Sequence, residues 1–230
     1  MNRVLNRIIN RPNWHNLRST KPVSEVFGYD RGTPLDRVYI EDFLQKNAGD
    51  IQGQVLEIGD DGYTQKFGAD VLKNEVLHAT PKNDEATIVG DLTNECTLPE
   101  DRFDCFICTQ TLNFIYDVQK AIRGSWFLLK EGGVMLTTVA GISQISRYDM
   151  DRWGDFWRFT TLSAQKAFAE VFGPANIEVD CYGNVLSAIA FLEGISAEEL
   201  SKKELFTKDD NYQVIITVRA VKRSQNLNGQ

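Results

Sequence analysis

Residues 53–63 read Gly-Gln-Val-Leu-Glu-Ile-Gly-Asp-Asp-Gly-Tyr, a short apolar run enclosed by glycines. The apolar part, residues 55–58, is too short for a helix and is typical of a buried strand. It ends in Gly59-Asp60-Asp61-Gly62, which predicts a sharp turn. In an open α/β sheet, the turn after the first strand binds nucleotide-like ligands, because glycine lets the backbone come close to them.

The composition is typical of a soluble globular protein with one domain and a sizeable core. The formal net charge of −7 argues against a broad nucleic-acid surface. No apolar run approaches the length of a membrane span, and the N-terminal residues lack the apolar core of a secretion signal. The four cysteines do not suggest a disulfide framework. We therefore expect a cytoplasmic protein without a transmembrane segment.

Metal and redox sites are not expected. The only histidines are His15 and His78, and a zinc site or a histidine-based triad would need one of them. Cys105 and Cys108 form a Cys-x-x-Cys pair, but they lie on a predicted strand, where residues three apart face opposite sides. A redox pair of this spacing would begin a helix instead. We therefore interpret both cysteines as core residues.

Residues 1–32 are predicted to form an N-terminal arm. Arg3, Arg7 and Arg11 recur every four residues opposite four apolar residues, which predicts a short basic amphipathic helix. One interpretation is contact with anionic lipid, that is, peripheral membrane binding. The interpretation that we favour is a helix packed on the edge of the domain with its arginines in water.

A family resemblance begins at Glu57 and Gly59. Together they give E-x-G, the beginning of the cofactor loop of class I S-adenosylmethionine (SAM)-dependent methyltransferases, and the chain resembles that family here. The family usually reads E/D-x-G-x-G-x-G. This chain has Asp61 and Tyr63 at the second and third glycine positions, so the later motifs have to support the resemblance.

Those later motifs follow in the family's order. Asp91 comes after the third predicted strand, Phe103-Asp104 leads into the fourth, and Leu129-Lys130-Glu131-Gly132-Gly133 precedes the fifth. The chain looks like the type 11 branch of class I methyltransferases. More loosely, it resembles bacterial members associated with polysaccharide biosynthesis.

The resemblance covers residues 33–222. It implies a Rossmann-like α/β fold with a mostly parallel seven-stranded sheet and an antiparallel last strand. Residues 183–210 are predicted to be an insertion before that strand, and residues 223–230 a flexible tail. Thr33 is expected to cap the first helix, with Pro34 as its first residue.

The other boundaries follow from apolar periodicity and turn residues. The sequence predicts strands at residues 55–58, 75–80, 86–89, 105–110, 134–139, 177–182 and 212–221. It predicts helices at residues 33–49, 118–129, 160–172, 185–192 and 197–206, with the glycines at 132 and 133 ending the second of them.

The resemblance implies a set of cofactor-binding residues: Glu57, Gly59, Asp60, Asp61, Gly62, His78, Asp91, Leu92, Thr109 and Gln110. Asp91 would accept a hydrogen bond from the adenine amino group, or it is an ordinary surface turn residue. The acid that usually holds the ribose hydroxyls is missing. His78 stands in that place, where it either contacts the ribose or only caps a strand; alternatively, Asp84 or Glu85 folds back to the ribose.

Residues 140–160 form a long aromatic and charged segment, which is unusual for a simple connection. In the resembled architecture it lies over the methyl-acceptor pocket, so Tyr148, Trp153, Trp157 and Arg158 are predicted acceptor-binding residues. The alternative is that the aromatic side chains only anchor the segment, as we expect for Phe159, and that Arg158 pairs with a carboxylate.

We therefore expect a SAM-dependent methyltransferase that acts on a small-molecule or saccharide acceptor. O-methylation is favoured, and nitrogen remains open as the acceptor atom. A hydroxyl acceptor needs a general base, for which Asp149 and Asp151 are the candidates. The alternative is a non-catalytic binding or assembly subunit, because the glycine motif is degenerate. A nicotinamide dehydrogenase is disfavoured because Asp61 breaks G-x-G-x-x-G. The sequence leaves a homodimer open.

Overall fold

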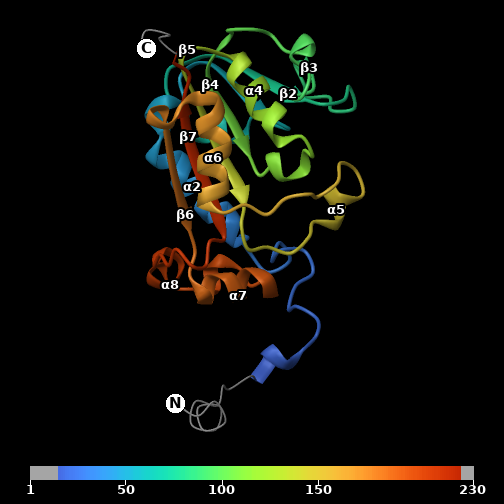
Figure 1. Ribbon diagram of the computed structural model, residues 1–230. Helices are drawn as coiled ribbons and strands as arrows, with labels where there is room; N and C mark the ends of the chain where they lie inside the picture. Colours follow the sequence, from blue (N-terminus) through green and yellow to red (C-terminus); the bar gives the residue numbers. More distant parts are fainter. Residues whose placement is uncertain (1–14, 224–230) are drawn as a thin grey trace.

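The computed structural model describes residues 15–223, which form one sheet with helices on both faces (Figure 1). The predicted basic helix at residues 3–11 and the predicted tail from residue 224 lie outside the described residues. No described helix reaches the length and apolarity that a membrane crossing requires.

The sheet has seven strands in the order β3-β2-β1-β4-β5-β7-β6. β7 runs antiparallel to both of its neighbours, and the other described pairs are parallel, which confirms the predicted topology. The chain passes from β1 outward in both directions, so the crevice beside β1 and β4 is the switch point where such sheets bind ligands. The strands are β1 (Gly53–Ile58), β2 (Val71–His78), β3 (Ile88–Val89), β4 (Phe103–Thr109), β5 (Leu129–Ala140), β6 (Ile177–Tyr182) and β7 (Ile215–Val221).

Two helix layers cover the sheet. α4 and α6 contribute to the buried cluster on one face, and α2 contributes to the cluster on the other. The described α-helices are α2 (Leu35–Lys46), α3 (Gly62–Phe67), α4 (Val118–Leu128), α5 (Arg147–Met150), α6 (Thr161–Phe172), α7 (Val185–Glu193) and α8 (Lys202–Phe206).

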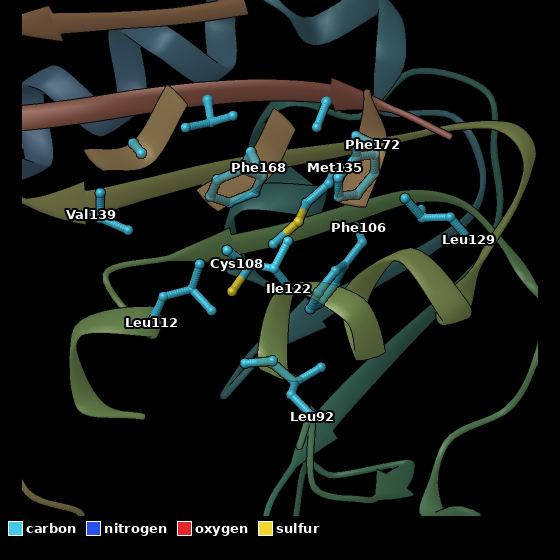
Figure 2. Packing of buried hydrophobic residues seen from close by; sticks show 14 of the residues in the cluster. Leu92, Phe106, Cys108, Leu112, Ile122, Leu129, Met135, Val139, Phe168 and Phe172 are labelled. Carbon is cyan, nitrogen blue, oxygen red and sulfur yellow. The ribbon is translucent and has the colours of Figure 1, made fainter. Parts of the chain in front are cut away.

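The larger cluster brings Phe106 and Met135 of the central strands against Ile122 of α4 and Phe168 of α6 (Figure 2). Each of these side chains is buried, so their contacts fix the two helices on the sheet. Cys108 belongs to this cluster, and burial raises the pKa of its thiol to about 12.

Cys105 packs in the cluster on the opposite face, with Val55 and Leu136. The two cysteines are free and buried, which confirms that they are core residues facing opposite sides of the sheet. Phe159 is also buried in the larger cluster, as expected from the sequence.

The predicted bounds of β2 were wrong at both ends. The strand begins at Val71, because this residue already pairs with Gly53 at the start of β1. It ends at His78 rather than Thr80, because the imidazole Nδ1 of His78 lies 2.7 Å from the carbonyl oxygen of Thr80 and the chain turns there. β3 keeps only two of the four predicted residues, since the amide of Ala86 is still bonded to the preceding turn.

The sequence predicted that the glycines at 132 and 133 end α4, and this prediction was wrong. The helix stops at Leu128, and β5 begins at once with Leu129, which pairs with Phe103. The register then shifts before Cys105. Gly132 has φ +81°, a conformation that favours glycine, so it serves an irregularity at the start of the strand.

Two more predicted elements were too long. Residues 197–206 are a 3-10 turn (Ala197–Glu199) followed by α8, because Ser201 caps a new helix with Glu204. β7 starts at Ile215 rather than residue 212, because the amide of Tyr212 donates to Asp209 in a turn.

The N-terminal boundary of α2 also differs. Pro34 occupies the cap position, and the side chain of Thr33 does not cap the helix. The Thr33 amide and hydroxyl instead donate to the Glu198 carboxylate, at 2.9 and 2.6 Å. Arg31 pairs with Glu199 at 2.7 Å. These contacts hold the end of the arm against the insertion, which also packs on α2.

Candidate functional site

A cavity of about 1640 Å³ opens at the carboxyl ends of β1, β2 and β4. Its inner half is lined by side chains that follow the parallel strands, within residues 57–63, 77–79, 90–93 and 109–111. Its outer half is lined by the arm and the start of α2, within residues 25–37, and by the segment after β5, within residues 143–158. The cavity therefore joins the predicted cofactor loop to the predicted acceptor segment.

Glu57 organises the loop after β1. Its side chain is buried, and its carboxylate accepts the amides of Tyr63 at 3.2 Å and Thr64 at 2.8 Å and the hydroxyl of Thr64 at 2.8 Å. Burial raises the pKa of Glu57 to about 7, although these hydrogen bonds favour the ionised form. The side chain thus ties the start of α3 back to the strand.

Within the loop, Gly59 has φ +88°, and a Cβ built on it would meet no atom within 4 Å. Its backbone therefore faces open space, which suits close approach of a ligand. Asp60 lines the cavity and accepts the amide of Gly62 at 2.9 Å. Asp61 points elsewhere: its carboxylate accepts the side-chain amides of Gln65 and Asn74 at 2.7 and 2.9 Å, and it does not line the cavity.

The structure brings His78, Asp91 and Leu92 together along the inner half. The His78 ring lies edge-on to Trp153, with 5.7 Å between the ring centroids. One Asp91 carboxylate oxygen accepts the amide and hydroxyl of Thr93, at 2.8 and 2.9 Å, which fixes its orientation. Trp153 of the outer segment therefore reaches the end of β2.

At the end of β4, Thr109 and Gln110 also line the cavity. Gln110 has φ +47°, which is uncommon for a residue other than glycine. Its amide donates to the Thr138 carbonyl at 2.8 Å, and its side chain to the Thr138 hydroxyl at 3.1 Å. Strained backbone of this kind clusters at functional sites, so it adds weight to Gln110 as a site residue.

Arg37 is a cavity residue that the sequence reasoning did not single out. Its guanidinium donates to the hydroxyls of Tyr63 at 2.6 Å and Tyr29 at 3.1 Å. Burial alone would lower the pKa of Arg37, but the hydroxyls and the neighbouring Asp36 carboxylate raise it, so the side chain stays cationic. The only sequence feature that pointed to Arg37 was its position directly after Asp36 in the first turn of α2.

The remaining basic side chains along the cavity already have carboxylate partners. The pairs are Lys66 with Glu41 at 2.6 Å, Arg147 with Asp151 at 3.0 Å and Arg158 with Asp155 at 2.5 Å. Among the described arginines and lysines that line the cavity, Arg37 is the one without a carboxylate within ion-pair distance. It is therefore the cation best placed to receive an anionic group of a ligand.

The two predicted bases are placed differently. Asp149 lines the cavity, and its carboxylate accepts the hydroxyl of Ser146 at 2.5 Å. Asp151 is exposed, pairs with Arg147 and does not line the cavity. Tyr148 lines the cavity, and its exposed ring lies 3.4 Å below the guanidinium of Arg152.

The other predicted acceptor-binding residues are Trp153, Trp157 and Arg158. Trp153 and Arg158 line the cavity, and Trp157 does not. The indole of Trp157 donates to two backbone carbonyls of residues 115 and 116, at 3.1 and 3.2 Å, so it anchors the segment. Arg158 also holds the segment in shape, because it forms two hydrogen bonds with the buried carboxylate of Asp155.

Asn113 lies beneath this segment, where its backbone carbonyl accepts the amide of Phe156 at 2.9 Å. Asn113 is among the residues that line the cavity and is 3% exposed, and its amide oxygen, which is fully buried, has no hydrogen-bond partner. Buried polar atoms almost always have partners, so this atom indicates a missing donor. In residues 15–223, no group of three or more His, Cys, Asp or Glu side chains is arranged to hold a metal ion.

Comparison with known proteins gives the fold a chemical context. Residues 48–137 match the type 11 methyltransferase family, described as a methyltransferase domain. A search of curated proteins found no significant match.

Several solved structures share the fold at low identity. The N-methyltransferase NodS from Bradyrhizobium japonicum WM9, in complex with S-adenosyl-L-homocysteine, aligns with a TM-score of 0.53 and 14% identity, over 88% of this chain and 95% of NodS. Phosphoethanolamine N-methyltransferase 2 from Haemonchus contortus, in complex with SAM, aligns with a TM-score of 0.52 and 15% identity, over 80% of this chain and 52% of that protein.

A SAM-dependent methyltransferase from Archaeoglobus fulgidus aligns with a TM-score of 0.51 and 10% identity, over 81% of this chain and 94% of that protein. These likenesses establish the fold, and the family match adds the chemistry. The chain is therefore similar to SAM-dependent methyltransferases: a methyltransferase domain matches over residues 48–137, which supports an enzyme whose cofactor is S-adenosylmethionine, and the fold is shared with such enzymes.

Proposed function

We propose that the inner half of the cavity binds SAM and that the outer half binds a small-molecule or saccharide acceptor. The observation that carries this proposal is the continuity of one cavity from the loop after β1 to the segment after β5. When bound, SAM supplies an electrophilic methyl group on a cationic sulfur. The residues of the chain have to orient that group and present a nucleophile in line with it.

The residues of the inner half fit this cofactor, together with Arg37 of the outer half, which bonds to Tyr63 after β1. Arg37 would bind the carboxylate of the methionine part, because it is a buried cation without a carboxylate partner. Gly59 leaves room beside the backbone, and Asp60 would favour the positive charge of the sulfonium or amino group. Asp91 and His78 would face the adenosine, in keeping with the order of the strand ends.

For an oxygen acceptor, a carboxylate has to take the hydroxyl proton while the oxygen attacks the methyl carbon. Of the two predicted bases we propose Asp149, since Asp151 lies outside the cavity. The aromatic faces of Trp153 and Tyr148 would stack on the acceptor. A saccharide hydroxyl, a role in polysaccharide biosynthesis, a cytoplasmic location and a homodimer remain proposals from the sequence.

The test is calorimetric titration of the purified protein with SAM and with S-adenosyl-homocysteine (SAH). We expect dissociation constants on the order of micromolar, and a loss of about tenfold or more in Arg37→Ala, the cost of a charge-assisted pair. Arg123→Ala removes an exposed arginine of α4 outside the cavity and is the matched control. Absence of binding by both ligands would contradict the proposal and favour a binding or assembly subunit.

A further inference from the structure

The helix α7 is apolar on all of its sides, and Ser187 and Glu193 are its only polar residues. Its inner side is buried, with Phe191 in one cluster with Leu35 of α2. A helix that is apolar all round is normally buried all round, so the described residues leave the outer side of α7 without its usual cover. The side chains on this outer side are 37% to 49% exposed and belong to Val185, Leu186, Ile189 and Leu192.

The outer side of α7 borders a groove with a volume of about 310 Å³. The N-terminal arm is fixed at one end of the helix, where the amide of Ser24 donates to the carbonyl of Glu193 at 2.9 Å. Because the arm is fixed there and then enters the groove, the residues before 15 start beside it. The large apolar residues that line the groove are Leu186 and Ile189 of α7, Ile195 and Leu200 after it, and Leu17 and Val23 of the arm.

The groove is also acidic. Glu193, Glu199 and Glu204 line it, and of these three only Glu199 forms an ion pair with a described residue, Arg31, at 2.7 Å. No lysine or arginine is found among the described residues that line the groove. An occupant should therefore combine apolar side chains with positive charge.

Residues 1–14 have this combination. Arginines recur there at every fourth position, and no acidic residue occurs before Glu25. As a helix, residues 3–11 would have the length of α7, which is nine residues or about 14 Å. Residues 12–16 can span up to about 17 Å, which is enough to connect that helix to Leu17 in the groove. The arginines are Arg3, Arg7 and Arg11, and the apolar residues on the other side of the helix are Val4, Leu5, Ile8 and Ile9.

We infer that residues 3–11 bind as an amphipathic helix in the groove beside α7 of the same chain. Their apolar side covers Leu186 and Ile189, and their arginines lie near the carboxylates of Glu193 and Glu204. Amphipathic helices commonly bind apolar grooves in this way. The short connection gives the segment an effective concentration on the order of millimolar, which favours it over a second copy of the chain. The carboxylates disfavour an anionic lipid surface as the occupant.

Trypsin cleavage after Arg7, followed by mass spectrometry, tests this binding in the whole chain. When docking and release are fast relative to cleavage, the cleavage rate follows the undocked fraction. The free peptide of residues 1–16 is the undocked reference, and we expect the intact protein to be cut at least about tenfold more slowly. This protection should not change when the protein is diluted about tenfold, because the segment and the groove belong to one chain.

Substitutions in the groove should release the segment. Ile189→Asp and Leu186→Asp should each bring the cleavage rate to within about threefold of the peptide's rate, because docking would bury the new charge. Leu162→Asp alters an exposed apolar residue of α6 outside the groove, so it is the matched control and should keep the protection. Leu5→Asp should also release the segment, measured against the peptide with the same change. Because residue 5 lies outside the described fold, this variant decides the question even if the α7 variants do not fold.

The charges of the groove are tested separately. Glu193→Gln keeps an oxygen that can accept the amide of Val23, so it should raise the cleavage rate about threefold through the lost charge alone. Glu170→Gln, an exposed residue of α6, is the control and should leave the rate unchanged.

Cleavage of the intact protein at the peptide's rate would overturn the inference, as would protection that persists in Leu5→Asp or in both α7 variants. Protection that is lost on dilution would assign the groove to a second copy of the chain. Protection that appears only with vesicles of phosphatidylcholine and phosphatidylglycerol would assign the segment to a membrane surface. Both of these results would overturn the inference as well.

Discussion

Replacing Glu57 with glutamine should change how the stability of the protein depends on pH. Glu57 is buried, and burial raises its pKa from 4.5 to about 7 in the folded protein. A group whose folded-state pKa is raised stabilises the fold fully below the unfolded pKa, and that contribution is lost as pH rises through the folded pKa. The affected window is therefore between pH 4.5 and 7.

The size of the effect follows from the shift. A difference of about 2.5 pKa units corresponds to about 3 kcal/mol, of which about 2.5 kcal/mol falls between pH 5 and pH 8. Glutamine has nearly the same shape and does not titrate. It also puts an N–H₂ group where the carboxylate accepts the Tyr63 or Thr64 amide, so a pH-independent loss of about 1–2 kcal/mol should accompany the change.

Urea unfolding of both proteins at pH 5, 6, 7 and 8 separates the two effects. We expect the difference in unfolding free energy between wild type and Glu57→Gln to move by about 2.5 kcal/mol in favour of the variant as pH rises from 5 to 8. Glu170→Gln, which alters an exposed carboxyl group, should show no such movement. A difference that stays constant across this range would refute the reasoning from burial.

Three further substitutions test other parts of the site. Gly59→Ala should lower the free energy of unfolding, measured in urea, by about 1–2 kcal/mol. No atom obstructs the new Cβ, but alanine is strained at φ +88°. An unchanged free energy of unfolding would contradict the need for glycine at this position. Arg158→Leu should lower the free energy of unfolding by about 2 kcal/mol in the same assay, because it leaves the buried Asp155 carboxylate unpaired. Arg147→Leu is the comparison: its partner Asp151 is exposed, so the loss should be under about 1 kcal/mol. Asp149→Asn should lower SAH formation with a hydroxyl acceptor by about a hundredfold or more, while Asp151→Asn retains it; the reverse order would assign the base to Asp151.

The sheet was predictable because its central strands are continuous apolar runs, which need burial on both faces. The same reasoning placed Cys105 and Cys108 on opposite faces, as found. The strand ends were less predictable. Val71 is apolar, but the polar residues 73–75 interrupt the apolar run, and it is their pairing with β1 that makes residues 71–75 part of β2. Gly132 and Gly133 lie inside β5 near its start, and a glycine pair can equally end a helix or mark an irregularity in a strand, so only the strand register distinguishes the two.

Some residues that line the cavity were predictable from the sequence, and others were not. The family resemblance predicted Asp91, and strand order predicted Gln110; both line the cavity, because topology brings the carboxyl ends of the strands to one edge. Arg37 and Asp36 reach the cavity from the opposite side, on a helix that precedes β1. Their place depends on how the arm packs against the insertion, through Arg31 and Glu199, and local sequence patterns carry no record of that contact.

The degenerate glycine motif also has a physical explanation. A glycine is needed in this loop where φ is positive, and that is Gly59. Asp61, at the second glycine position of the family, has φ −117°, a value open to any residue, and its carboxylate binds Gln65 and Asn74. Tyr63, at the third position, lies inside α3, and its amide bonds to Glu57. The loop therefore keeps its path without the other glycines, so their loss is a weak argument for a non-catalytic subunit, and SAH binding is the measurement that decides between the two.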